Sequence, residues 1–440
     1  MSYDPAFQKR IYDMLMESQY WSADAMHAFQ SQQLSQLLKF ARDTVPFYKE
    51  RLANALTAGG RVNWDRWHEI PILRRDDLLN NREAMLAPTQ PRGHGDLGDH
   101  LGSGTTGKPV TSRHNSLMPL VSHTAQHRAW GWHHVDYSKV ICHYWGDDPP
   151  TAKWPEGENR GAWGPHWDPL SAAGKSLIIN RETIPEQVAE YLGRNFVSYL
   201  TGRPRTVQSV ALAAEQMGIK LKLAALFTLG TSADESAQAD CRRVFGAEII
   251  SNYSSKEVYN IAHQCPTGQH YHVNAELLFL EVLDDSGRAC APGERGNAII
   301  TSFYNTSQPF IRYEIGDQII MGEQCACGCT LPVIEKIAGR TTHLFRFPAG
   351  RKIAPSISIK HMPLISAKSW QIAQTGPLKI EVRYILNGIG SKPNFEAFSS
   401  FVRAGTDPRV EVNYKIIESL PLTPSGKFIE YVCELPPETT

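Results

Sequence analysis

Between residues 184 and 250 the sequence alternates short apolar runs with amphipathic segments of helical length. Helices are predicted over residues 184–195, 204–218 and 236–245, and strands over 196–200, 223–229 and 248–250. Such alternation is typical of a parallel sheet whose strands are connected by covering helices. This feature constrains the fold most, because it predicts an α/β architecture with mixed, mostly parallel sheets.

The regions on either side of this segment have other patterns. Helical spacing extends over residues 7–53 and 113–136, and two antiparallel strands are predicted over 277–283 and 297–301. After Gly339-Arg340 the pattern changes to strands over 378–386 and 410–417 around a helix over 394–403. A chain of 440 residues is expected to form at least two domains. We therefore predict a large domain over residues 1–338 and a small α+β domain over 339–440.

Composition restricts the classes of partner. Acidic and basic residues number 45 each, so the formal charge is zero, and neither nucleic acid nor membrane is predicted as a partner. Residues 1–10 are polar, unlike a signal peptide, and no apolar run approaches the roughly 20 residues of a membrane span. Eight scattered cysteines are then expected to be reduced. The expectation is a soluble, cytoplasmic protein, and a homodimer is left open.

A glycine-rich loop at residues 102–109 has the composition of a phosphate-binding segment. Gly102 to Lys108 match the first seven positions of a Walker A loop, but Pro109 stands where that loop needs a hydroxyl for magnesium. The loop still offers exposed backbone N–H groups, three side-chain hydroxyls and the Lys108 cation to a polyphosphate. We therefore interpret it as an ATP-binding loop outside the P-loop NTPase fold. A polar surface turn is the alternative.

Four further motifs follow this loop in a fixed order. They are Asn252-Tyr253-Ser254-Ser255-Lys256-Glu257, Arg312–Asp317 (RYEIGD), Gly339-Arg340 and Leu420–Lys427 (LPLTPSGK). With these motifs the chain resembles the adenylate-forming superfamily, and within it the branch of phenylacetate–CoA ligase and coenzyme F390 synthetase. The segments ARDTVPFY (41–48), IPILRRDD (70–77) and LTGRP (200–204) extend the resemblance over nearly the whole chain.

The resemblance implies a role for each motif in the activation of a carboxylic acid by ATP. The implied ATP-binding residues are Ser103, Gly104, Thr105, Thr106, Gly107, Lys108, Thr231, Ser232, Asn252, Tyr253, Ser254, Asp317 and Arg340. Glu257 would hold magnesium, Asp317 would accept the ribose hydroxyls, and Lys427 would bridge the acid and the nucleotide from a mobile C-terminal domain. Taken singly, Glu257, Asp317 and Lys427 also fit ordinary helix-start, turn and surface positions.

The chain departs from the family pattern at two places. Family members have glycine and threonine where this chain has Ser254 and Lys256, and an acidic pair after Gly-Arg where it has Thr341-Thr342-His343. Because Lys256 is adjacent to Glu257, we hypothesise that it is a further catalytic contact to phosphate or carboxylate. Because the residues after Gly339-Arg340 differ from the family pattern, the sequence supports adenylation more strongly than it supports rotation of the C-terminal domain.

A group of cysteines and histidines has the residue types of a structural zinc site. The resemblance implies Cys265, His270, Cys325 and Cys327 as ligands of a Zn²⁺ ion that does no chemistry. His272 is a rival to His270, and Cys329 stands where the family has arginine and is a further candidate. Buried free thiols are the alternative.

Aromatic residues between the phosphate loop and Tyr253 are candidates for the acid-binding pocket. We expect His143, Tyr144, Trp145 and the stretch from Trp154 to Trp167 to line it, which would suit an aryl or arylacetic acid. The resulting hypothesis is an AMP-forming ligase that uses ATP and Mg²⁺ and transfers the acyl group to coenzyme A. An amine acceptor, giving an amide, and a non-catalytic nucleotide-binding protein are the alternatives.

Overall fold

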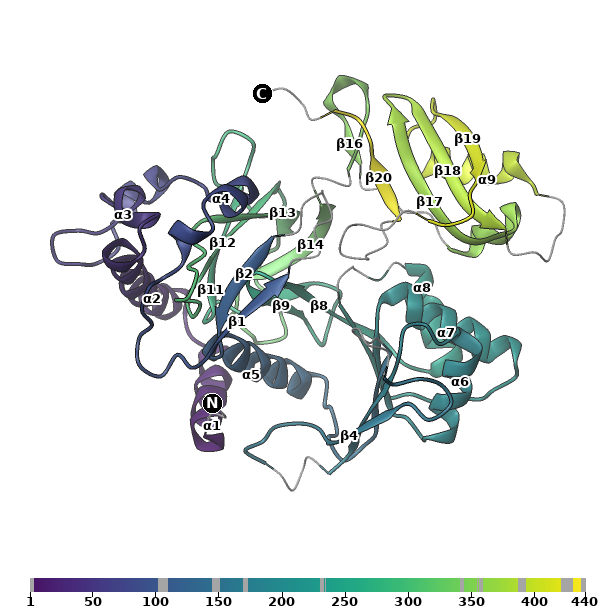
Figure 1. Ribbon diagram of the computed structural model, residues 1–440, viewed down its shortest axis with the longest axis horizontal. Coiled ribbons are helices and arrows are strands. Elements are labelled where there is room, and N and C mark those ends of the chain that lie inside the picture. Colours follow the sequence, from purple (N-terminus) through teal and green to yellow (C-terminus); the bar gives the residue numbers. More distant parts are fainter. Residues whose placement is uncertain are drawn as a thin grey trace.

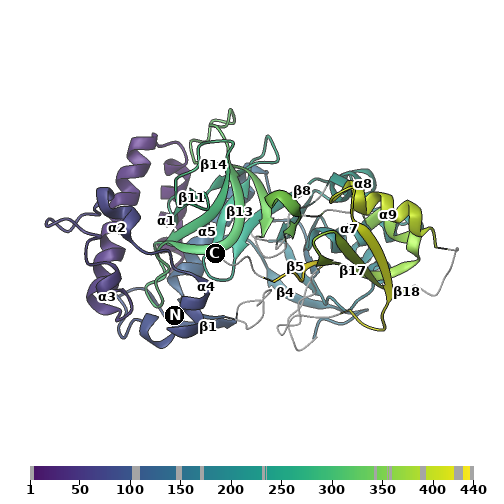
Figure 2. The ribbon, with the colours of Figure 1, turned by 90° about the horizontal axis from the view of Figure 1, so that it is seen from above.

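The computed structural model describes most of the chain. The described residues are 4–101, 110–144, 151–168, 173–229, 233, 235–340, 344–353, 355, 359–386, 393–420 and 430–436. They form two groups of elements along an elongated molecule, with helices α2 (Ala23–Thr44) and α3 (Tyr48–Arg51) at one end. The C-terminal sheet lies at the opposite end (Figures 1 and 2).

A mixed sheet of twelve strands is the centre of the fold, with the order β11-β12-β13-β14-β10-β9-β8-β7-β6-β3-β5-β4. The strands are β3 (Ile141–Tyr144), β4 (Glu158–Ala162), β5 (Lys175–Ile179), β6 (Tyr199–Gly202), β7 (Ala225–Leu229), β8 (Ile249–Ser255), β9 (Tyr259–Gln264), β10 (Tyr271–Val273), β11 (Leu278–Leu283), β12 (Arg295–Ser302), β13 (Tyr313–Met321) and β14 (Val333–Arg340). Pairing is parallel from β5 through β3, β6 and β7 to β8, and antiparallel elsewhere. The predicted α/β fold class is confirmed.

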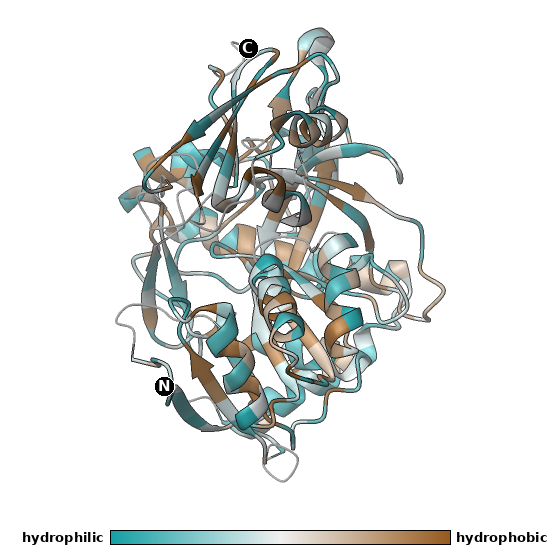
Figure 3. Ribbon diagram, turned by 90° about the vertical axis from the view of Figure 1, so that its right-hand side faces the viewer, coloured by the Kyte–Doolittle hydropathy of each residue, from teal (hydrophilic) through white to brown (hydrophobic). Residues whose placement is uncertain are grey.

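Three amphipathic helices cover one face of the parallel half of the sheet (Figure 1). They are α6 (Pro185–Arg194), α7 (Pro204–Gln216) and α8 (Glu235–Phe245), close to the predicted ranges. Hydrophobic and hydrophilic residues alternate along these helices (Figure 3), as expected for helices with one buried face. The strand predicted from Phe196 begins later, at Tyr199, because Phe196 is exposed with a positive φ of 51° and Val197 N–H bonds back to Leu192 O.

Helix α5 (Leu117–Trp132) packs on the other face of the sheet and against α1 (Pro5–Ser18). The helix predicted over 113–136 is therefore shorter at both ends. Its first residues belong instead to β2 (Thr111–Asn115), which pairs with β1 (Leu97–Leu101). The Asn115 side chain then accepts a hydrogen bond from Met118 N–H and begins the helix.

The N-terminal helices pack against the antiparallel half of the sheet. The predicted helical segment 7–53 is divided into α1, α2 and α3, because Ser22 caps α2 and Pro46 follows its end. Leu34, Leu38 and Trp67 form a core with Phe303. Helix α4 (Arg75–Asn80) follows, and the backbone of Leu73 pairs with Arg312 and Glu314 beside β13.

Four C-terminal strands form a separate sheet in the order β19-β18-β17-β20. These strands are β17 (Ala367–Gly376), β18 (Lys379–Leu386), β19 (Glu411–Ile416) and β20 (Tyr431–Cys433). The other C-terminal elements are helix α9 (Phe395–Ala404) and the paired strands β15 (Phe345–Arg346) and β16 (Lys352–Ile353). Phe398 and Val402 on α9 pack with Trp370, Ile372 and Val382 of the sheet. Among the described residues, no helix is long and apolar enough to cross a membrane.

Candidate active site

Several predicted site residues lie outside the described residues. They are the phosphate-loop residues Ser103, Gly104, Thr105, Thr106, Gly107 and Lys108, together with Trp145, Thr231, Ser232, the hinge residues 341–343 and Lys427. The two strands that flank the phosphate loop are described and pair with one another from Leu101 and Thr111 onwards.

The hairpin of β1 and β2 packs beside the turn that carries the predicted magnesium residue. The rings of His100 on β1 and His114 on β2 lie 6.2 and 5.3 Å from the ring of Tyr259, between centroids. Tyr259 begins β9 immediately after the turn that contains Lys256 and Glu257. The structure therefore brings the base of the phosphate-loop hairpin next to this turn.

Tyr253 and the predicted ribose residue Asp317 are in direct contact. The Tyr253 hydroxyl donates to Asp317 Oδ2 over 2.9 Å, from β8 to β13. The backbone of Asp317 also pairs with Arg340 at the end of β14, the neighbouring strand on the β8 side of β13. Three motifs that are separated by up to about ninety residues in sequence thus meet along these strands.

Arg312, at the start of the RYEIGD motif, has a structural role. It is buried, pairs with Glu281 over 3.1 Å, and donates to the carbonyl oxygens of Trp67 and Ile70. This contact ties the 70–77 segment to the strand that carries Asp317. The arginine therefore positions β13 through its own contacts.

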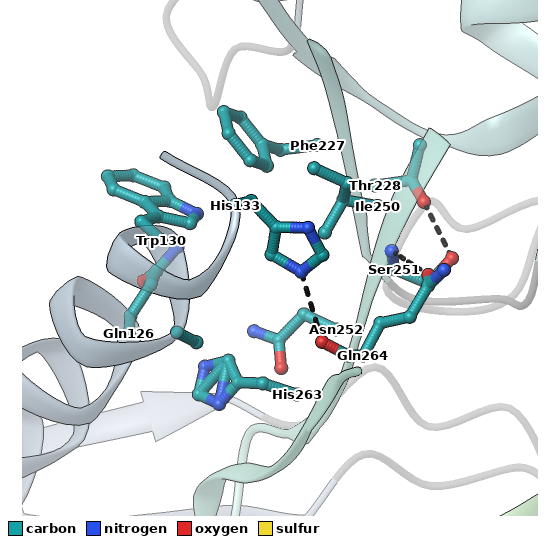
Figure 4. Close-up of a pocket in the computed structure, with 11 residues that line it drawn as sticks. Gln126, Trp130, His133, Phe227, Thr228, Ile250, Ser251, Asn252, His263 and Gln264 are labelled. Atoms are coloured by element: carbon teal, nitrogen blue, oxygen red, sulfur yellow. Dashed lines mark hydrogen bonds between the residues drawn. The ribbon is translucent and has the colours of Figure 1, made fainter. Parts of the chain in front are cut away.

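A pocket lies between α5 and strands β7, β8 and β9 (Figure 4). Trp130 of α5 and Phe227 of β7 form its apolar side, with ring centroids 5.0 Å apart. His133 Nε2 donates to Gln264 O over 3.0 Å, while Asn252 and His263 line the polar side. Asn252 directly precedes Tyr253 on β8, so one strand connects this pocket to Asp317.

The predicted acid-pocket residues His143 and Tyr144 lie on opposite faces of the sheet. His143 is in register with Thr201, Phe227 and Ile250, so it shares the pocket face, and its Nδ1 lies 2.8 Å from Thr201 Oγ1. Burial lowers the pKa of His143 to about 4. Tyr144 instead belongs to the core under α6–α8, and its hydroxyl donates to Thr183 O. A strand alternates its side chains, so the two residues do not line one pocket.

The aromatic stretch that follows is mainly packing. Trp154 packs against the α6–α8 core and under Arg194, and Trp163 packs with Trp130 and Tyr199. None of the predicted acid-pocket residues that the structure describes is among those that line the pocket at α5, so their assignment to the acid site stays a prediction.

Sequence reasoning missed His263, Phe227 and most of the α5 contribution to the pocket. A usable signal was present in β9, where Asn260, His263 and Gln264 are polar residues in a buried strand. A buried polar side chain needs a partner, so such a strand indicates a hydrogen-bond network or a ligand.

The cysteine–histidine group is gathered at the ends of β9 and β10 and the loop before β14. Ligand atoms of Cys265, His272, Cys325 and Cys327 all lie within 4.8 Å of one another. The histidine of this group is His272, the rival, whereas His270 lies beside the group with its Nε2 3.0 Å from Cys325 Sγ. Cys329 is buried with Met26 and Leu331, outside the group.

The distances in this group suit a tetrahedral ion. The Sγ atoms of Cys265 and Cys325 are 3.7 Å apart, and Cys327 Sγ is 3.3 Å from His272 Nε2. The other ring nitrogen of His272 lies 3.4 Å from Leu331 O, which is the usual support for a metal-binding histidine. Burial opposes ionisation of Cys325, but hydrogen bonds from Cys327, His270 and Cys265 lower its pKa to about 6. Three thiols and an imidazole are a donor set that zinc prefers.

Comparisons with known proteins agree with this architecture. No family model matches the chain. A phenylacetate–coenzyme A ligase of Thermus thermophilus is 22% identical over 329 residues, which cover 72% of this chain and 71% of that protein. This similarity to a phenylacetate–CoA ligase agrees with the resemblance to the adenylate-forming superfamily that the motifs indicate.

Solved structures show the same fold. The 2-hydroxyisobutyryl-CoA ligase in its postadenylation state has a TM-score of 0.69 at 16% identity, covering 95% of this chain and 93% of that one. The same ligase in its thioesterification state has a TM-score of 0.61 at 18% identity, covering 95% and 93%. An anthranilate CoA ligase has a TM-score of 0.52 at 14% identity, covering 83% and 73%.

Proposed function

We propose that this protein is an AMP-forming acid–thiol ligase. It would join a carboxylic acid to AMP and transfer the acyl group from the adenylate to coenzyme A. The arrangement around β8 supports this proposal best. Asn252 lines a pocket, Tyr253 bonds to Asp317, and the turn with Glu257 lies beside the phosphate-loop hairpin. An acid, a ribose and a polyphosphate would thus be held along one strand.

The chemistry assigns a task to each group. A carboxylate and the α-phosphate of ATP repel one another, so cations and N–H donors must neutralise the developing charge. In the proposal, residues 103–108 hold the β- and γ-phosphates, and Asp317 holds the ribose. Glu257 provides a carboxylate for magnesium, and Lys256 provides a cation one residue away. Lys427 approaches from the C-terminal domain.

The acid is proposed to be an aryl or arylacetic acid. Trp130 and Phe227 support this, because their rings offer a flat apolar side to the pocket. Coenzyme A is proposed as the acceptor from the similarity to CoA ligases. An amine acceptor remains the second candidate on the family chemistry alone.

We also propose that the chain divides into domains near residue 339 and that the cysteine–histidine group binds one structural zinc. β14 extends to Arg340, and the C-terminal sheet begins at Ala367, so the proposed boundary lies at the end of the large sheet. Zinc would fix the loop before β14 to β9 and β10. These contacts would support Asp317 and Arg340 without taking part in the reaction.

ATP–pyrophosphate exchange across benzoic, arylacetic, hydroxylated and fatty acids tests the function. We expect exchange with one class of acid, followed by AMP release that coenzyme A stimulates. Lys427→Ala should lower exchange at least about 100-fold, because it removes the cation that bridges the two anions. Lys415→Ala, an exposed lysine on β19, is the matched control and should retain activity.

The outcomes separate the alternatives. AMP release that amines stimulate and coenzyme A does not would replace the thioester by an amide. ATP binding without exchange for any acid would favour the non-catalytic reading. Normal exchange in Lys427→Ala would remove that lysine from the mechanism.

A further inference from the structure

Two polar atoms in the pocket between α5 and the sheet lack a hydrogen-bond partner. They are Asn252 Oδ1 and His263 Nε2, and both are shielded from solvent. His263 is only 4% exposed. The two residues are direct cross-strand partners on β8 and β9, and Figure 4 shows the Asn252 amide beside the His263 ring. Leaving a buried polar atom unpaired is unfavourable, so a ligand group is expected to pair with both atoms.

The hydrogen-bond network fixes which atom of Asn252 faces the pocket. Asn260 Nδ2 donates to Ser122 O over 3.1 Å, so Asn260 Oδ1 must face Asn252. Asn252 Nδ2 donates to that oxygen over 2.6 Å. The remaining atom of the amide, Asn252 Oδ1, is therefore an acceptor in need of a donor.

A second network fixes the tautomer of His263. Arg128, which can only donate, bonds to Asn274 Oδ1 over 2.9 Å. Asn274 Nδ2 therefore faces His263 Nδ1, 3.2 Å away, and makes that nitrogen the acceptor. Because Nδ1 accepts this hydrogen bond, the ring proton is on Nε2, which is therefore a donor in need of an acceptor.

We propose that the pocket recognises a hydroxyl group on the carboxylic acid substrate. A hydroxyl donates its proton to Asn252 Oδ1 and accepts from His263 Nε2–H, so one group satisfies both atoms. A methyl group satisfies neither, and an ether oxygen cannot donate. This inference rests on the proposed function, because it names the class of acid that the ligase selects.

The size of the pocket agrees with a small polar group at this position. The cavity has a volume of about 30 Å³, which is room for a hydroxyl or a water beside the two residues. The apolar rings of Trp130 and Phe227 flank the same space. The substrate would therefore present a hydroxyl next to an apolar body.

The test uses the full-length wild-type enzyme and matched sets of acids in ATP–pyrophosphate exchange. Each set contains a hydroxy acid and the analogues in which methyl, methoxy or hydrogen replaces the hydroxyl. The sets cover 2-hydroxyalkanoic acids and the isomeric hydroxybenzoic and hydroxyphenylacetic acids. For at least one set, we expect kcat/KM to be at least about tenfold higher for the hydroxy acid than for its methyl analogue.

A variant tests the assignment to His263. His263→Phe removes the Nε2–H donor, while Asn274 Nδ2 keeps its bond to Asn260 O. The preference for hydroxyl over methyl should fall at least about threefold below its wild-type value, because the hydroxyl then keeps only its bond to Asn252 Oδ1. His68→Phe, at an exposed histidine far from the pocket, should keep the wild-type preference.

Each result decides a different claim. Exchange in the wild type with no hydroxyl preference in any set would overturn this inference and leave the ligase proposal standing. Asn252 Oδ1 and His263 Nε2 would then pair with a bound water only. A preference that His263→Phe leaves intact would overturn the assignment to this residue. Absence of exchange with every acid, despite ATP binding, would overturn both proposals.

Discussion

At the scale of single residues, the contact between Tyr253 and Asp317 joins two motifs of the candidate site. Tyr253 is buried and its hydroxyl donates to Asp317 Oδ2 over 2.9 Å. In the proposed function, Asp317 accepts the two ribose hydroxyls and must be held in one orientation. The tyrosine would then act as a positioning residue, and its phenol ring also packs in the core.

Tyr253→Phe should raise the KM for ATP several-fold with a smaller change in kcat. The substitution removes one hydrogen bond, at a cost of about 1 kcal/mol in stability, and leaves the ring packing in place. Steady-state exchange kinetics at varied ATP would measure the effect. Tyr48→Phe is the control, because the Tyr48 hydroxyl bonds to Pro309 O away from the site. An equal rise in KM in both variants would contradict a specific role.

At the scale of elements, a buried ion pair connects α5 to the loop between β10 and β11. Arg128 and Glu276 are both fully buried and 2.6 Å apart, and Ser18 of α1 donates to the same carboxylate oxygen. The pair thus holds two helices against the sheet. The same arginine orients Asn274, and through it His263, so packing and the candidate pocket share one network.

Arg128→Met should lower the free energy of unfolding by about 3–5 kcal/mol, because it leaves the Glu276 carboxylate buried without a counter-charge. The double variant Arg128→Met/Glu276→Gln should be less destabilised than the single one. Guanidinium unfolding curves of both proteins would measure the difference. Equal losses in the two proteins would mean that the charge of Glu276 does not cause the cost.

The proposed zinc site joins three separate segments of the chain. Replacing one of its ligands should therefore lower the zinc content of the purified protein. Purified wild-type protein should contain about one zinc per chain, and Cys325→Ser should lose most of it because a thiolate ligand is replaced by a hydroxyl. Cys290→Ser, outside the group, is the control. Metal analysis by mass spectrometry gives the count. Wild-type protein that stays metal-free after incubation with zinc would reject the site.

At the scale of the whole molecule, buried histidines make stability depend on pH. Burial lowers the pKa of His114, His127 and His263 to about 3, whereas an unfolded histidine titrates near 6.5. Between these values the unfolded chain binds more protons than the native one, so stability is complete above about pH 6.5 and is lost as the pH falls towards about 3.

The free energy of unfolding should therefore be lower at pH 5.5 than at pH 7.5, by up to about 1.4 kcal/mol per pH unit for each such histidine. Denaturant unfolding at the two pH values measures this slope. His127→Phe should make the slope shallower, because one titrating group is removed. Equal or greater stability at pH 5.5 would contradict the assignment of neutral buried histidines.

Much of the fold could be predicted from the sequence, because local patterns determine it. The helices at 185–194, 204–216 and 235–245 lie close to their predicted ranges, since amphipathic spacing and, in the first two, an initial proline are local signals. The predicted helix boundaries were wrong where a strand that is distant in sequence pairs with the segment. Residues 113–115 have helical spacing but form β2, because β1 supplies backbone partners that a single segment cannot reveal.

The sequence by itself determined the α/β class, the order of the motifs and the residue types available for metal and phosphate. It could not choose between His270 and His272, which are only two residues apart at the start of β10. Nor could it show that His143 and Tyr144 lie on opposite faces of the sheet, or that His263 lines the pocket. Those choices depend on which strands and helices pack together, because a side chain's chemistry is set by the atoms around it in space. Only the tertiary structure brought Asn252, His263 and Asn274 together.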